Sequence, residues 1–158
     1  MAQAGPEGKP PGAAPAVYRS NRSFLLAIGA AFVALLATVG APLAAYQGAW
    51  GVEIDAAHSH LLTALSAPCP LLALAGVLVW WGPPLARQAL VWVGGLGTCA
   101  VCVAWVLLSG TRQVAFAPIP DGAAPGVMAV SATLGAIAAL TMMVADDVAW
   151  RRALAGSE

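Results

Sequence analysis

The sequence predicts an all-α polytopic membrane protein, a four-transmembrane-helix bundle with both termini in the cytoplasm. The 158 residues are 60% hydrophobic and only 9% charged, with a mean hydropathy of +0.81, whereas soluble domains carry about 25% charged residues. The apolar residues gather into four runs of about 20, the length that crosses ~30 Å of hydrocarbon as a helix. The basic residues concentrate on one side of these runs, which sets the expected orientation.

The sequence divides into three regions. Residues 1–22 form a tail rich in Gly, Pro and Ala, a composition that buries too little apolar surface to fold, so we expect it to be disordered unless a partner binds it. Residues 23–152 form the membrane domain, and residues 153–158 a short cytoplasmic C-terminus. The four spans are expected at about 24–46, 58–81, 88–108 and 126–146.

The first span should pack closely against a neighbour, because alanine and glycine recur along it at helical spacing and allow backbones to approach. Tyr46 and Trp50 follow it as anchors at the membrane interface. The second span ends in Trp80 and Trp81, a further pair of expected anchors, and Gly82-Pro83-Pro84 then stops the helix. Pro68 and Pro70 interrupt its middle. Each removes a backbone donor and crowds the preceding turn, so they predict a kink.

Small residues also mark the third and fourth spans. Gly94 and Gly95 lie in the first half of the third. Ser131, Gly135 and Ala139 recur at four-residue intervals in the fourth, which predicts one helix face suited to close packing. Trp150 follows as an anchor near the end of this helix.

Orientation follows from the basic residues near the span ends. With the N-terminus inside, one side of the membrane holds six of them and the other holds Arg112 alone. The six are Lys9, Arg19, Arg22, Arg87, Arg151 and Arg152. The positive-inside rule therefore places both termini in the cytoplasm. The high Ala and Gly content is typical of GC-rich bacteria, so we expect the cell membrane of such a bacterium, with an organellar inner membrane as the alternative.

A polar approach to the second span carries Glu53, Asp55, His58 and His60. Imidazole and carboxylate together suit transition metals. However, Asp55 is a plausible N-cap, and in a helix that starts after it the two histidines would point to nearly opposite sides. Only an extended segment would let them share a face. We therefore favour a polar helix start over a metal site.

Three cysteines, Cys69, Cys99 and Cys102, lie within apolar runs. Counting ~1.5 Å per residue from the inner boundary places Cys69 and Cys99 at similar depths on adjacent helices, so a thiol cluster is geometrically feasible, and soft thiolates favour Cu(I). An apolar environment keeps thiols neutral, and cysteine also serves as a small packing residue. We expect packing.

The sequence predicts no ionisable residue well inside any span, and such residues usually mark ion or proton pathways. It also carries no phosphate loop and no nucleophile elbow. We therefore expect a non-enzymatic protein with no catalytic residues and no predicted cofactor. The net charge of zero and the scattered basic residues argue against a nucleic-acid partner.

The leading hypothesis is a non-catalytic accessory or structural subunit, or an assembly factor, of a larger membrane complex, contacting other subunits through small-residue helix faces and a partner through the tail. One alternative is a small copper-handling or thiol-redox membrane protein. Another is a lipid- or quinone-binding protein that holds its ligand in a helix groove beside the proline kink.

Overall fold

The computed structural model describes residues 21–40, 60, 63–111, 113–114, 117–118 and 124–155. Within these residues the chain is helical apart from a bend at Ala67, the turn between α4 and α5, and one hairpin with two residues in each strand, which confirms the all-α class. The helices are α1 (Asn21–Leu35), its π-helical continuation η1 (Leu36–Gly40), α4 (Pro68–Leu78), α5 (Pro84–Thr111) and α6 (Ala124–Ala155). Strands β1 (Gln113–Val114) and β2 (Ala117–Pro118) pair antiparallel between α5 and α6.

Three helical segments of the described chain are long and apolar enough to cross a membrane, which indicates a membrane-associated protein. They are Arg22–Gly40, Pro84–Leu107 and Gly126–Ala155. The fourth apolar helix, α4, has only 11 residues. The expected disordered tail lies outside the described residues apart from residues 21 and 22. Residues 41–46 of the predicted first span and residues 58, 59, 61 and 62 of the predicted second span also lie outside them.

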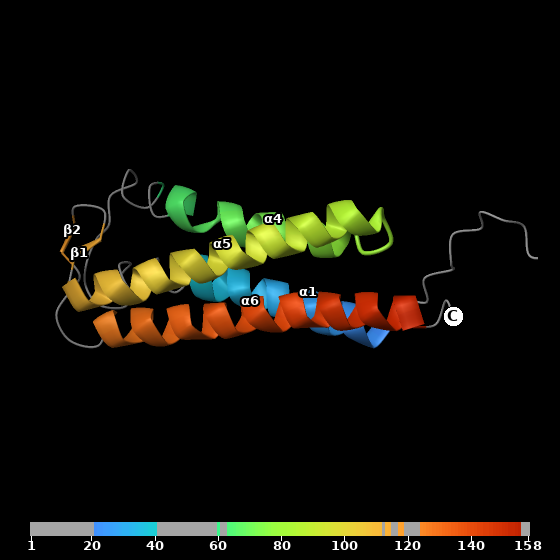
Figure 1. Cartoon of the computed structure of the whole chain (residues 1–158). Helices are drawn as coiled ribbons and strands as arrows, with labels where there is room; N and C mark the ends of the chain where they lie inside the picture. Colours follow the sequence, from blue (N-terminus) through green and yellow to red (C-terminus); the bar gives the residue numbers. More distant parts are fainter. Residues whose placement is uncertain are drawn as a thin grey trace, which may run out of the picture.

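The helices lie along one another in alternating directions (Figure 1). α1 and α5 run one way and α4 and α6 the other. Each of α1 and α5 packs against both α4 and α6. The beginning of α1 and the end of α6 consequently lie at the same end of the body.

The chain bends at Ala67, where a helical turn over residues 63–66 meets the start of α4. The Ala67 amide still donates to the Thr63 carbonyl at 2.8 Å, and Leu71 donates back to Ala67 at 3.0 Å. Pro68 occupies the first position of α4, where its missing amide hydrogen costs no intrahelical bond. The interruption therefore comes directly before the first proline.

Glycines bring the backbones of α4 and α5 together. A β-carbon at Gly94 would collide with the backbone nitrogen of Ala73, and one at Gly76 would lie 2.8 Å from the backbone nitrogen of Val91. Both glycines are buried. Because each helix places a glycine against the other's backbone, neither position has room for even a methyl group.

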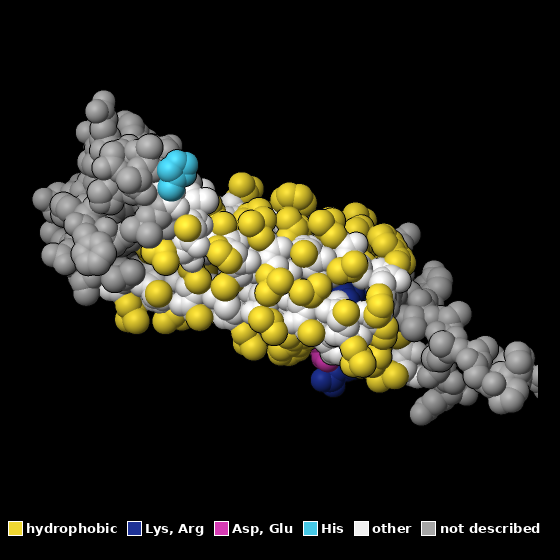
Figure 2. Space-filling model, turned by 90° about the horizontal axis from the view of Figure 1, so that it is seen from above, with side chains coloured by type: hydrophobic (Ala, Val, Ile, Leu, Met, Phe, Trp, Pro, Cys, Tyr) yellow, Lys and Arg dark blue, Asp and Glu magenta, His cyan; other side chains and the backbone are white. Residues whose placement is uncertain are grey.

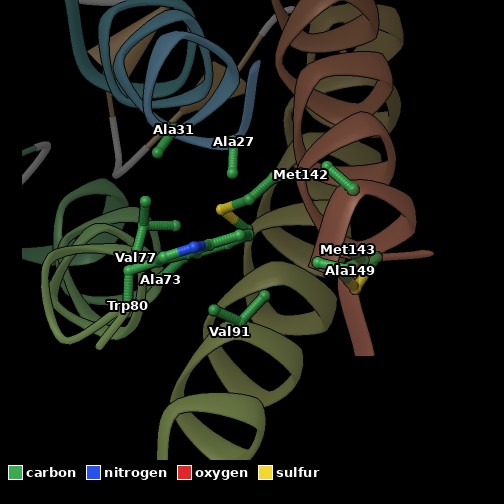
Figure 3. Close-up of a cluster of buried hydrophobic side chains, with 10 residues drawn as sticks. Ala27, Ala31, Ala73, Val77, Trp80, Val91, Met142, Met143 and Ala149 are labelled. Carbon is green, nitrogen blue, oxygen red and sulfur yellow. The ribbon is translucent and has the colours of Figure 1, made fainter. Parts of the chain in front are cut away.

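Figure 3 shows the main apolar core, in which the Trp80 side chain reaches from the turn after α4 toward Met142 of α6. Ala27 and Ala31 of α1 are both buried beside it. These small side chains leave the space that the indole and the flexible methionine fill.

The close approach of α4 and α5 can be tested by substituting alanine for glycine. Gly94→Ala should lower the stability of the purified protein in detergent by about 1–3 kcal/mol, the usual effect of overpacking a core. Gly29 has nothing within 4 Å of its would-be β-carbon, so Gly29→Ala should be neutral or slightly stabilising. Thermal unfolding of the two variants in parallel measures the difference, and equal transition temperatures would refute this packing.

Candidate functional site

A buried ion pair joins α5 to α6. Arg87 Nε lies 2.9 Å from Asp146 Oδ1, and the two side chains are 1% and 0% exposed. Such burial is unusual, since an ionised group removed from water loses several kcal/mol of solvation unless a partner compensates it. The pair therefore requires α5 and α6 to keep the register that brings these two residues together.

Trp80 completes this polar cluster from the α4 side. The Arg87 guanidinium carbon lies 4.7 Å from the centroid of the indole ring, a cation–π distance. The Arg87 Nη1 group also donates to the Trp80 carbonyl oxygen at 3.3 Å. One guanidinium thus contacts a carboxylate of α6 and both the ring and the backbone at the end of α4. We name Trp80, Arg87 and Asp146 the charged cluster.

A tight turn positions the arginine. The Trp80 amide donates to the Val77 carbonyl oxygen at 3.0 Å, and the Gly82 amide donates to the Val79 carbonyl oxygen at 2.8 Å. The chain therefore reverses its direction within a few residues. Pro84 begins α5, where proline is well tolerated. Arg87 consequently lies in the first turn of α5 and reaches back across the turn to Trp80.

Two adjacent aspartates on α6 have different surroundings. Asp146 is turned inward, whereas Asp147 pairs with Arg151 one turn later at 2.7 Å, in a pair whose side chains are 32% and 77% exposed. Successive residues on a helix point about 100° apart, so one faces the interior and the other the surface. The Asp147–Arg151 pair is the one that sequence spacing predicts.

The prediction that no ionisable residue lies inside a span is wrong. Arg87 and Asp146 are buried, and both lie within the apolar helical segments Pro84–Leu107 and Gly126–Ala155. The helices extend beyond the expected spans of 88–108 and 126–146, so residues assigned to the membrane boundary belong to the packed helices. A sequence pattern does not show that two such residues face each other.

The two neighbouring tryptophans also differ. Trp80 is fully buried, which corrects the expectation that it anchors the membrane interface, whereas Trp81 is 66% exposed. The Phe24 ring lies 4.8 Å from that of Trp81 and 5.8 Å from that of Trp80. Trp150 is half-buried. Tyr46 and Trp50 lie outside the described residues.

The three cysteines are free and contact different neighbours. Cys69 packs against Gly97. The Cys99 thiol donates to the Ala136 carbonyl oxygen over 3.9 Å, and the Cys102 sulfur lies 3.6 Å from Thr38 Oγ1 of η1. In the described part of the chain, no three His, Cys, Asp or Glu side chains gather where they could hold a metal ion.

Of the polar approach to α4, only His60 is described, as an exposed helical residue. Glu53, Asp55 and His58 lie outside the described residues, so their expected roles stay predictions.

The small residues singled out in the sequence lie mostly inside the body. Gly94, Gly95, Gly135 and Ala139 are buried, and Ser131 is half-buried. A β-carbon on Gly95 would meet Met143, and one on Gly135 would lie 3.0 Å from both Cys102 and Thr38. These positions mediate packing between the protein's own helices.

The surface carries a groove of about 510 Å³ between α1 and α6. Leu26, Ile137, Leu140, Val144 and Val148 supply much of its lining, and Arg22 and Arg152 both lie along it. A smaller groove of about 220 Å³ lies between α5 and α6, lined by residues that include Cys102, Ala132, Thr133 and Ala136.

Comparison with protein-family models, with curated proteins and with solved structures finds no match for this chain.

The buried and exposed ion pairs provide a matched comparison. Asp146→Asn or Arg87→Gln should destabilise the protein by about 3–5 kcal/mol, because each leaves the other charge buried without its partner. Asp147→Asn and Arg151→Gln remove the same charges from an exposed i,i+4 pair and should cost about 0.5 kcal/mol or less. Thermal unfolding in detergent measures all four. If the variants of both pairs lose similar amounts of stability, the buried charges do not depend on each other for compensation, and the interpretation is contradicted.

Proposed function

We propose that the protein is a non-catalytic accessory subunit or assembly factor of a larger membrane complex, built as a four-span bundle. The observation that carries the proposal is the closed charged cluster. Arg87, Asp146 and Trp80 engage one another inside the bundle. An ionisable residue within a span is by default a candidate for ion or proton transfer. Here the charges compensate each other and connect α5, α6 and the turn after α4. This arrangement favours a structural role.

The outer surface has features that suit contact with a partner protein as well as with lipid. Figure 2 shows one face of the body, hydrophobic along its middle, with charged side chains near one end and a histidine near the other. Thr133 is exposed and borders both the α5–α6 groove and a second shallow depression of about 260 Å³ on α6. Its hydroxyl donates to the Ala129 carbonyl oxygen at 2.8 Å, so it presents mainly its methyl group outward. Small side chains on such a surface suit the close approach of another transmembrane helix.

The proposed location is the cell membrane of a GC-rich bacterium with both termini inside. Arg22 near the start of α1 and Arg151 and Arg152 near the end of α6 gather at one end of the bundle. Arg87, in the first turn of α5, belongs to the same end. Basic residues at one end favour its cytoplasmic placement.

Affinity purification in a mild detergent tests the subunit proposal. The wild-type protein should co-purify with other membrane proteins in a particle larger than its own monomer. Thr133→Phe should remove those partners, because the ring fills the groove against which a partner helix would pack, while the protein's own fold is retained. Val93→Phe, at an exposed position of α5 that lines neither groove, should leave the partners bound. A wild-type chain that migrates alone as a monomer would overturn the proposal.

Reporter fusions test the orientation. Alkaline phosphatase fused after Ala155, at the end of α6, should stay inactive because the proposal places that end in the cytoplasm. The same enzyme fused after Thr111, at the end of α5, should be exported and active. Active enzyme after Ala155 and inactive enzyme after Thr111 would invert the topology.

A further inference from the structure

We propose that the groove between α1 and α6 binds one anionic phospholipid, with its phosphate held by Arg22 and Arg152 and an acyl chain along the apolar wall. The assignment goes beyond a role in complex assembly, because it concerns a site formed by this chain alone.

Charge is the first argument. Arg22 on α1 and Arg152 on α6 are both exposed and line the same groove, and Ser23 adds a polar group beside Arg22. The two described carboxylates of α6 are already engaged, Asp146 by Arg87 and Asp147 by Arg151. Arg22 and Arg152 have no carboxylate partner within the part of the chain that the structure describes. Two guanidinium groups beside one depression suit a phosphate, which they can bind through paired hydrogen bonds.

The apolar wall is the second argument. Below the arginines the groove continues along α6 from Val148 to Ile137, and Leu26 forms part of the opposite side on α1. From Arg152 to Ile137 the helix advances by about 22 Å at ~1.5 Å per residue. That length exceeds the roughly 15 Å of one leaflet of the hydrocarbon core. A charged mouth above an apolar channel matches a lipid with an anionic headgroup better than a soluble anion, which would use only the arginines.

The third argument is the position of the arginines at one end of the protein. Basic pockets between transmembrane helices on the cytoplasmic side are a recognised setting for anionic headgroups, and the arginines gather at the end proposed to face the cytoplasm. The groove also joins α1 to α6, which are the first and last helices of the bundle. A bound lipid would therefore bridge the first and last helices that the structure describes.

Native mass spectrometry of the purified protein in neutral detergent, titrated with phosphatidylglycerol or phosphatidylcholine, tests the site. Phosphatidylglycerol should bind preferentially and in a one-to-one ratio. Arg22→Gln and Arg152→Gln should each weaken it about fivefold, since a basic residue near an anionic headgroup contributes about 1 kcal/mol. Arg151→Gln changes the net charge equally but lies outside the groove, and should weaken binding by less than about twofold.

A second pair of variants tests the apolar wall. Val144 and Val93 are both 61% exposed, and only Val144 lines the groove. Val144→Trp should displace the lipid, whereas Val93→Trp should not, and inorganic phosphate should not compete. Unchanged thermal unfolding of each variant without lipid verifies its fold.

The proposal is overturned if phosphatidylcholine binds as well as phosphatidylglycerol, or if Arg151→Gln weakens binding as much as Arg152→Gln. Competition by inorganic phosphate would reduce the site to an anion site. A cross-link from Val144→Cys to a partner subunit in place of lipid would also overturn it. The outcomes measured with phosphatidylglycerol, phosphatidylcholine and inorganic phosphate do not depend on whether the protein enters a larger complex.

Discussion

The buried Arg87–Asp146 ion pair is the constraint on which the rest of the structure depends. Its 2.9 Å contact requires the first turn of α5 and the last third of α6 to meet in one register. Hydrophobic contacts between apolar helices tolerate sliding, but an unpaired charge inside the bundle would be strongly unfavourable. The pair therefore penalises any arrangement of α5 and α6 that separates the two charges.

Neighbouring features follow from that register. Trp80 stacks on Arg87 and fills the space left by Ala27 and Ala31, so α1 joins the core through small side chains. The Gly94 contact with Ala73 brings α4 close to α5, which lets a short helix of 11 residues present Trp80 at the required depth. Charge pairing, aromatic packing and glycine contacts thus support the same arrangement.

Composition and hydropathy were sufficient to predict the helical class and the apolar segments, because both depend on single-chain properties. Spacing along one helix was likewise sufficient to predict the Asp147–Arg151 pair, whose members lie four residues apart. The charged cluster was missed because Arg87 and Asp146 are 59 positions apart in the sequence, each beside a predicted span end where charge is common. The burial of Trp80 was missed for a related reason. Trp80 and Trp81 are the same residue type at adjacent positions, and only the geometry of the turn buries one and exposes the other.

We propose, as the central claim, that the charged cluster serves packing and not the transfer of ions, protons or substrates. The most direct measurement combines stability and co-purification for the double variant Arg87→Met, Asp146→Leu. Replacing both charges with apolar side chains of similar size often leaves stability unchanged or raised. This variant should therefore unfold at or above the wild-type temperature and co-purify with the same proteins as the wild type. A double variant that folds stably, yet no longer co-purifies with the proteins that accompany the wild type, would contradict the claim, because the charges would then act beyond packing.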